Sequence, residues 1–326
     1  MKGSHPEIDR DWTEGKPRIG ISSCLLGEPV RYNGQHQRDR FLTDTVGQFV
    51  EWVPVCPEVE CGLSVPREAM RLVGDPDDPR LVTSRTGRDM TEKMVTFARE
   101  RVQELEDENL CGFIFKSKSP SSGMERVKVY DENGVPQSVG VGMFAREFMD
   151  HFPLVPVEED GRLHDSKLRE KFFENIFCFR DYRRARASGE MSDLIRFHTR
   201  HKLQLMAHSP EKLKEMGRVV ATAQEMSDDP FQRYEELLRE AMGEMPSRGK
   251  NANVIHHMLG YFKDDLSSWE KQELVRVTNE YHEGLVPLVV PVTLVEHYVR
   301  KYDKEYLGDQ SYLRPHPVEL KLRNHA

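Results

Sequence analysis

Hydrophobic and polar positions follow two different periods along the chain. In the first half, short apolar runs that end at Ser, Cys or Gly alternate with stretches of helical spacing. RIGISSCL (18–25), VPVC (53–56) and CGFIFKSKS (111–119) have the apolar content of buried strands. FLTDTVGQFVEW (41–52) and MTEKMVTFARERVQELEDEN (90–109) place apolar residues three and four positions apart, as amphipathic helices do. This alternation predicts a parallel sheet with crossover helices.

From about residue 165 onward the helical period dominates, and no comparable strand pattern follows. The apolar stretch LVPLVVPVTL (285–294) carries two prolines, which predict a turn before the final helix. We therefore expect an α/β N-terminal domain with a parallel sheet and crossover helices, followed by an all-α C-terminal domain. The expected divisions are a flexible N-terminus (1–17), an α/β domain (18–160), a helical linker (161–190) and a helical domain (191–326).

Composition indicates the class of protein and its cellular compartment. Of the 326 residues, 37% are hydrophobic and 31% are charged, which is typical of a soluble globular protein. No apolar run approaches the ~18 residues of a membrane span, and the N-terminus lacks the apolar core of a signal peptide. We expect a cytoplasmic protein with no membrane partner.

A net charge of −8 argues against a general nucleic-acid coat. One segment is nevertheless basic, since Arg180–Lys202 holds seven Lys or Arg against three Asp or Glu. Such a segment, with aromatic residues among its cations, can bind an RNA backbone. A solvated helix face is the other interpretation.

Chemistry-bearing residues follow directly after the predicted strands. Because the carboxyl ends of parallel strands meet at one edge of a sheet, Cys24, Cys56 and the turn SPSSG (119–123) are expected to lie close together. The chain has five cysteines, an odd number that does not suggest a disulfide framework. Cys24, Cys56 and Cys61 form a candidate ligand set for zinc or an iron–sulfur cluster. Buried apolar thiols are the alternative.

Two further kinds of side chain in these turns bear on chemistry. Glu58, two residues after a cysteine, is a candidate for proton transfer, or else a solvated loop acid. Ser119, Ser121 and Ser122 are suited to orient a substrate or simply to cap the next element.

Three separated motifs resemble one family in the correct order. SCLLGEPVRYNG (23–34), VCPEVECGLSVPRE (55–68) and FKSKSPSSGMERVKVY (115–130) together resemble the thiouracil desulfidase (TudS-like) proteins. The helical part resembles the YbgA-like domain in residues 193–218, 247–263 and 313–325. The fused arrangement is similar to the RudS-type desulfidases, which remove sulfur from 4-thiouridine in transfer RNA.

The resemblance implies a 4Fe–4S cluster held by three cysteines, with one open iron that takes the sulfur of a thiocarbonyl. It implies Cys24 and Cys56 as ligands, Glu58 as the catalytic acid, and a catalytic serine at Ser119 or, as second choice, Ser121. The remaining pocket positions that we assign from the matching motifs are Ser23, Arg31, Tyr32, Asn33, Lys116 and Ser122.

This chain departs from the family at one ligand position. Relatives commonly have Ser-Pro-Ser-Cys-Gly at the turn, with the cysteine as third ligand, whereas this chain has Ser122. A serine hydroxyl is a poor iron ligand beside a thiolate. Cys111 would be separated from the turn by roughly 35 Å of extended strand. We therefore predict Cys61 as the third metal ligand.

The resemblance also gives the helical domain a role. We expect it to hold the tRNA substrate, with phosphate contacts from Arg183, Arg184, Arg186, Arg196, Arg200, Lys202 and Lys250. Two alternatives stay open: a desulfidase of free thiolated bases, and a non-catalytic RNA-binding protein whose cluster site has decayed at Ser122. A zinc protein is less well supported, because a structural zinc site needs four ligands and three are found.

Overall fold

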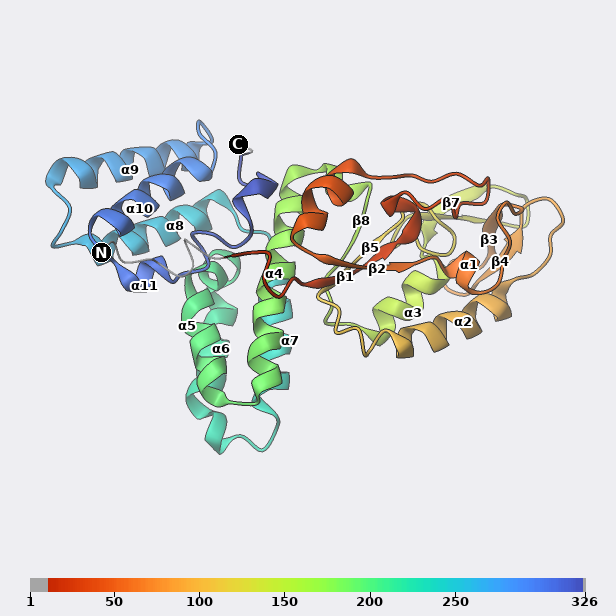
Figure 1. Ribbon diagram of the computed structural model, residues 1–326, viewed down its shortest axis with the longest axis horizontal. Coiled ribbons are helices and arrows are strands. Elements are labelled where there is room, and N and C mark those ends of the chain that lie inside the picture. Colours follow the sequence, from red (N-terminus) through yellow and green to blue (C-terminus); the bar gives the residue numbers. More distant parts are fainter. Residues whose placement is uncertain (1–10, 325–326) are drawn as a thin grey trace. The chain divides into compact units, whose positions relative to one another are not determined.

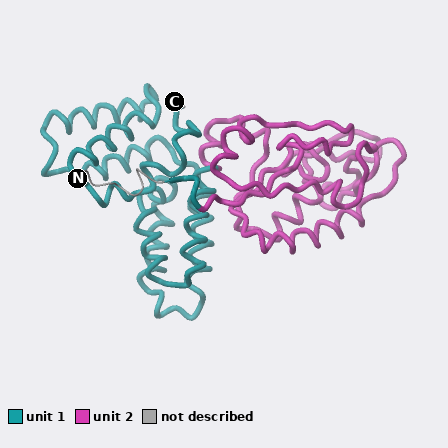
Figure 2. Tube along the Cα trace, viewed as in Figure 1, with its two compact units in different colours: residues 1–14, 173–326 teal, residues 15–172 magenta. Residues whose placement is uncertain are grey.

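The computed structural model describes residues 11–324 and divides into two compact units. One comprises residues 15–172, and the other comprises residues 1–14 together with 173–326 (Figure 2). The boundary at residue 172 lies inside the long helix α4 (Ser166–Ser188). Among the described residues, no helix is both long enough and apolar enough to cross a membrane.

The first unit is built on an all-parallel sheet with the strand order β2-β1-β5-β8. Every residue of the β5 segment GFIF is buried, as expected of a strand covered on both faces. Helices α2 (Thr91–Glu104) and α3 (Met143–His151) lie on one side of this sheet (Figure 1). Aromatic rings from β5 pack in the same apolar cluster as these helices, and the rings of Phe113 and Phe144 have centroids 5.9 Å apart. The strands are β1 (Arg18–Ser22), β2 (Glu51–Val55), β5 (Gly112–Phe115) and β8 (Val157–Glu159).

A second, mixed sheet has the order β4-β3-β6-β7, in which only β3 and β6 are parallel neighbours. Its strands are β3 (Met70–Gly74), β4 (Pro79–Thr83), β6 (Val127–Tyr130) and β7 (Pro136–Gly140). The helices of this unit are α1 (Pro57–Glu60), α2 (Thr91–Glu104) and α3 (Met143–His151).

The predicted helix over 41–52 is wrong in its second part, because Glu51 and Trp52 begin β2 and only irregular helical turns precede them.

The second unit is entirely helical in its described part, which confirms the predicted fold class. Its remaining helices are α5 (Met191–His208), α6 (Pro210–Thr222), α7 (Pro230–Gly243), α8 (Arg248–Leu259), α9 (Ser268–Glu283), α10 (Val289–Lys301) and α11 (Glu305–Gly308). The predicted turn lies at residues 284–288, directly before α10, and contains Pro287. Pro291 lies in the first turn of α10, where a missing N–H removes no helical hydrogen bond.

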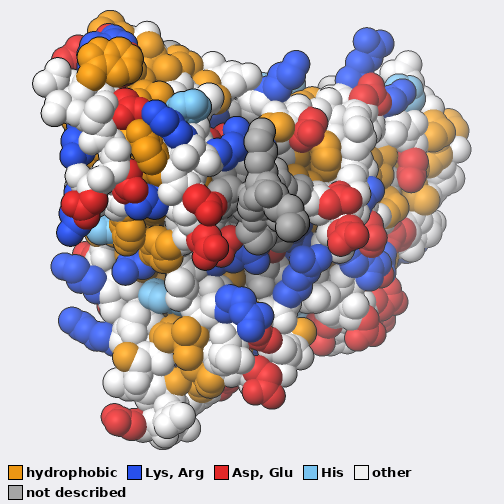
Figure 3. Space-filling view, turned by 60° about the vertical axis from the view of Figure 1, so that its left-hand side comes forward, with side chains coloured by type: hydrophobic (Ala, Val, Ile, Leu, Met, Phe, Trp, Pro, Cys, Tyr) orange, Lys and Arg blue, Asp and Glu red, His pale blue; other side chains and the backbone are white. Residues whose placement is uncertain are grey.

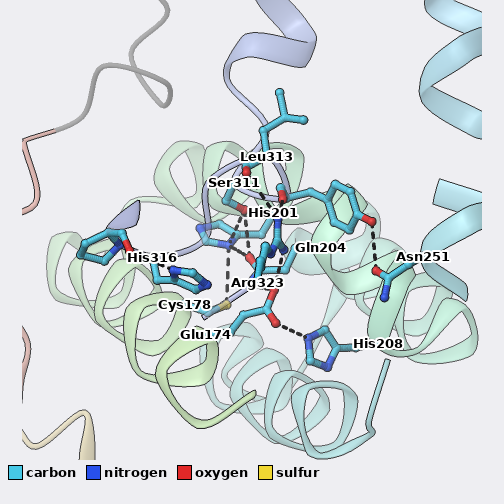
Figure 4. A network of polar contacts seen from close by, with 12 residues as sticks. Glu174, Cys178, His201, Gln204, His208, Asn251, Ser311, Leu313, His316 and Arg323 are labelled. Atoms are coloured by element: carbon cyan, nitrogen blue, oxygen red, sulfur yellow. Dashed lines mark hydrogen bonds and ion pairs between the residues drawn. The ribbon is translucent and has the colours of Figure 1, made fainter. Parts of the chain in front are cut away.

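A buried polar network joins the C-terminal segment to the helices of this unit (Figure 4). Glu174 accepts a hydrogen bond from Gln204 (3.1 Å) and lies 3.4 Å from the His208 ring. Arg323 approaches the same carboxylate at 3.6 Å and donates to the carbonyl of Tyr312 (2.6 Å). The network thereby compensates the charges that this unit buries.

The N-terminal segment belongs to the helical unit. Residues 1–10 of the predicted flexible N-terminus lie outside the described part, but Trp12 is buried. Its ring packs edge-on against Phe177, with centroids 5.0 Å apart, and Arg180 lies over it at 5.1 Å.

Candidate active site

The carboxyl ends of the four parallel strands surround one pocket of about 590 Å³. Cys24 follows β1, Cys56 follows β2, the segment Lys116–Ser122 follows β5, and Asp160 follows β8; all of them line this pocket. The predicted convergence of Cys24, Cys56 and the serine turn at one sheet edge is therefore confirmed.

The serine turn is held by the start of α3. The N–H groups of Met143 and Phe144 donate to the carbonyls of Pro120 (3.2 Å) and Ser121 (2.9 Å). A Cβ atom at Gly142 would lie 2.6 Å from the Ser121 backbone, so only glycine permits this close approach. A side chain at Gly123 would similarly meet the carbonyl of Ser119 at 2.8 Å. Both glycines are thus required for the turn to bring its hydroxyl groups into the pocket.

Glu58 is fixed on both carboxylate oxygens. Arg67 donates to its Oε2 from Nε (2.8 Å) and from a second guanidinium nitrogen, and Ser121 Oγ donates to its Oε1 (2.9 Å). Ser119 and Ser121 hydroxyls are 3.0 Å apart. The structure therefore brings Ser121 into direct contact with Glu58, while Ser119, the first choice from the sequence, reaches Glu58 only through Ser121.

Cys24 and Cys56 line the same pocket, and their surroundings change the pKa of each thiol. Burial raises the pKa of Cys24 to about 11, against the opposing charge of Lys116. Burial also raises the pKa of the Cys56 thiol. Burial therefore favours the neutral thiol at both positions.

Cys61 does not lie at the pocket. It ends the single turn of α1, and its thiol donates to the carbonyl of Glu58 (3.3 Å). The side chain is buried in an apolar cluster with Leu72, Leu81, Met94 and Val129. The structure thus does not bring the predicted third ligand to Cys24 and Cys56, because α1 turns residue 61 toward this core.

Ser122 occupies the wall of the pocket instead. It is 4% exposed, its N–H donates to Ser119 Oγ (3.1 Å), and its hydroxyl makes no hydrogen bond to any described residue. Cys24, Cys56 and Ser122 therefore line the same pocket, together with five other serines. Thiolates are the ligands that iron–sulfur clusters use, so the donor set suits such a cluster in kind but supplies two cysteines where three were predicted. Among the described residues, no group of three His, Cys, Asp or Glu is arranged to hold a metal ion.

Most of the other predicted pocket residues line the cavity, namely Ser23, Arg31, Tyr32 and Lys116. Asn33 does not, because its amide exchanges hydrogen bonds with Gln35 on the exposed side of the loop. Asp160 and His164 line the pocket but were missed from the sequence. The short strand before Asp160 carries acidic residues, VEE, and so lacked the apolar signal of the other strands.

Lys116 and Asp160 form an ion pair within the pocket. Lys116 Nζ lies 2.7 Å from Asp160 Oδ2, and the other carboxylate oxygen accepts from the N–H of Ser117 (2.7 Å). Burial opposes ionisation of Asp160, but Lys116 and Ser117 outweigh it and lower its pKa. The pair presents a fixed cation and a fixed anion side by side.

The predicted RNA contacts fall into separate groups in the helical unit. Arg186 binds Glu235, and Lys250 binds Glu244 (2.7 Å) and the carbonyl of His208, so both stabilise local structure. Arg183 and Lys202 lie on α4 and α5 outside any described cavity. Arg184, Arg196 and Arg200 line one hollow between these two helices.

The N-terminal unit is similar to a known protein family. Residues 19–160 match the family described as "2-thiouracil desulfurase". The chain is also 32% identical over 110 residues to the uncharacterized protein YbbK of Bacillus subtilis, covering 72% of that protein and 32% of this chain. The chain belongs to the 2-thiouracil desulfurase family through its N-terminal unit.

The desulfurase region is followed by a second matched region. Residues 202–317 match a family described as "Protein of unknown function (DUF1722)". The chain is 28% identical over 152 residues to the uncharacterized protein YbgA of Escherichia coli, covering 90% of it and 46% of this chain. The N-terminal desulfurase domain and the YbgA-like C-terminal domain that were expected from the motifs are therefore confirmed.

One solved structure, a 4Fe–4S-dependent thiouracil desulfidase (TudS), is also similar. It shares 28% identity with a TM-score of 0.39, and the match covers 46% of this chain and 95% of that one.

Proposed function

We propose that this protein removes sulfur from a thiolated uracil, and that its substrate is 4-thiouridine in transfer RNA. One observation carries the proposal: a carboxylate fixed by an arginine and a serine, Glu58, lies in the same pocket as the thiols of Cys24 and Cys56. Membership of the 2-thiouracil desulfurase family supports the reaction class.

Cys24 and Cys56 are the residues that would hold an iron–sulfur cluster, with the Ser122 oxygen at the position of the third ligand. When bound, a cluster with an open iron supplies a Lewis acid and an acceptor for sulfur. The side chains provide the remaining chemistry, which is an exchange without net oxidation: water supplies the oxygen of the product carbonyl, and sulfide leaves.

Glu58 is the group that moves protons in this exchange. Its carboxylate takes a proton from the attacking water and returns one to the departing sulfur, so the residue is unchanged over the cycle. Arg67 holds one carboxylate oxygen and Ser121 the other, which fixes the orientation of the carboxylate before substrate binds. Ser119 positions Ser121 through their 3.0 Å hydroxyl contact.

The Lys116–Asp160 pair suits a uracil ring. A uracil presents a carbonyl oxygen next to an N–H group, and these complement an ammonium donor next to a carboxylate acceptor. Arg31 and the 44% exposed Tyr32 line the same pocket and provide a cation and an aromatic face for a nucleotide. A thiolated base in a folded RNA would have to leave its stack to enter.

The decisive test is anaerobic reconstitution with iron and sulfide, followed by single-turnover assays. We expect sulfide release from 4-thiouridine-containing tRNA, and a much lower rate with free 4-thiouracil or 2-thiouracil. Rapid turnover of the free bases with none of the RNA would refute the RNA substrate while keeping the reaction class. Glu58→Gln is the catalytic control.

Ser122 and the position of Cys61 favour one other function, a non-catalytic RNA-binding protein that has lost its cluster. It predicts that the reconstituted chain retains no iron or sulfide, yet still binds tRNA. Iron and sulfide analysis after desalting separates the two functions.

A further inference from the structure

A second cavity, of about 200 Å³, lies within the helical unit between α4 and α5. Three arginines line it: Arg184 from α4, and Arg196 and Arg200 from α5. The two α5 residues are four positions apart and so lie one turn above each other on the same face. Three long cationic side chains from two helices therefore converge on one hollow.

The carboxylates at this hollow already have cationic partners. Asp181 accepts from Arg180 on one oxygen (2.8 Å) and lies 3.3 Å from His201 Nε2 on the other. Asp193 pairs with Arg196 at 2.9 Å. With three arginines against these two carboxylates, the lining of the hollow still carries an excess of positive charge.

Arg200 is the most enclosed of the three cations. Burial lowers its pKa, and the charge of Asp309 opposes this effect only in part. A guanidinium that has lost hydration gains most from an anion that can accept several of its N–H groups. On the face of the molecule drawn in Figure 3, lysines and arginines are scattered among acidic side chains.

We propose that this hollow binds a phosphate group of the RNA substrate. The inference rests on the proposed function and narrows the predicted RNA contacts from seven residues to Arg184, Arg196 and Arg200. The planar guanidinium groups match the geometry of phosphate oxygens, and the volume admits one phosphate with part of its ribose. Because the neighbouring Phe197 is 4% exposed, the ligand contact is with phosphate and not with a stacked base.

The test is binding of unmodified tRNA to the full chain, measured by fluorescence anisotropy over a series of salt concentrations. Arg184→Gln and Arg196→Gln change exposed side chains and are expected to fold, while Arg200→Gln removes the enclosed one. Each substitution should weaken binding about tenfold. The slope of log affinity against log salt should fall by ~0.7 to 0.9 for each lost phosphate contact.

Arg276→Gln is the matched control, because this arginine lies on α9 in ion pairs with Glu273 and Glu280 away from the hollow. It should leave both affinity and slope unchanged. Inorganic phosphate should compete with tRNA for the wild-type chain. Equal tRNA affinity of wild type and all three variants would overturn the inference, as would phosphate binding at the hollow without competition against tRNA.

Different results would contradict phosphate binding at the hollow and the proposed RNA substrate. A chain that binds no tRNA but releases sulfide from free thiouracil would contradict the RNA substrate itself. A chain that binds tRNA equally well with and without the three arginines would contradict only the hollow.

Discussion

At position 122 this protein has an oxygen where the motif expected from the family resemblance has a sulfur, and we expect this atom to affect how firmly an iron–sulfur cluster is held. Thiolates are the usual ligands of iron–sulfur clusters, and the hydroxyl of Ser122 is a weaker donor. Ser122 lines the pocket, and its hydroxyl makes no hydrogen bond to any described residue. Position 122 is thus open to a change of donor atom without loss of an existing contact.

We therefore expect Ser122→Cys to raise the iron and sulfide retained per chain after anaerobic reconstitution, and to slow iron loss to a chelator. The substitution changes one atom of a side chain already directed to the pocket. Retention equal to that of wild type would indicate that residue 122 is not a ligand position.

Removal of individual thiols provides a second prediction. Cys24→Ala and Cys56→Ala should each abolish iron retention, because both thiols line the pocket. Cys61→Ala should retain as much iron as wild type, because that thiol is packed in an apolar cluster. It should cost only about 1 kcal/mol of stability through lost packing. Loss of iron in the Cys61 variant would restore Cys61 as the third ligand.

Glu58 can be tested against a neighbour on the same helical turn. Glu58→Gln should lower the single-turnover rate by about 10²- to 10⁴-fold, the contribution usual for proton transfer by a positioned group. Glu60→Gln is the control, since Glu60 does not line the pocket and pairs with Arg101 at 2.9 Å. Glu60 also accepts a hydrogen bond from the N–H of Cys56 (2.5 Å), which the amide oxygen of glutamine can still accept. Equal rates for wild type and Glu58→Gln would remove Glu58 from the chemistry.

At the level of elements, the start of α3 determines the shape of the serine turn. Gly142→Ala would place a Cβ atom 2.6 Å from the Ser121 backbone, so either the helix or the turn must shift. We expect destabilisation of about 1–3 kcal/mol in urea unfolding and a reduced desulfurisation rate. Gly260→Ala, where no heavy atom lies within 4 Å of the added Cβ, should leave both unchanged.

The strands that carry the site were predictable because their sequences are continuously apolar and end at polar turns. RIGIS, VPV and GFIF all lie in the parallel sheet, and the residues after them meet as expected. β8 escaped prediction because VEE has no apolar signal; two of its residues, Glu158 and Glu159, are buried among hydrogen bonds, for example from Arg162 and Met124. The position of Cys61 also depended on tertiary packing, since a Cys-x4-Cys spacing does not specify which side of α1 each thiol faces.

For the whole molecule, the buried charges of the helical unit make stability depend on pH. Burial disfavours ionised Glu174, but its hydrogen bond to His208 and the nearby charges of Arg323 and His316 outweigh burial and lower its pKa to about 2. The pKa of this group is 4.5 when unperturbed, so its contribution is fully present above pH 4.5 and is lost as pH falls toward 2. The difference corresponds to on the order of 3 kcal/mol.

Glu174→Gln should therefore destabilise the helical unit by about 3–5 kcal/mol at neutral pH, because buried cations lose their partner. It should also flatten the fall in stability below pH 4.5, as followed by far-UV circular dichroism during urea unfolding. Glu236→Gln changes a half-buried residue paired with Arg233, and as the control it should change neither the stability nor its pH dependence. An unaltered pH profile in the Glu174 variant would contradict this assignment.

The burial of Trp12 has a consequence for how the chain is made. Its partner Phe177 and the cation over it, Arg180, are translated only after the whole sheet-bearing unit has been completed. At ~5–20 residues per second, this indole must wait on the order of ten seconds on the ribosome before its site exists. During that interval the nascent protein exposes a tryptophan that chaperones can bind. A fragment that begins at residue 173 would lack Trp12 and would leave its packing site against Phe177 and Arg180 empty.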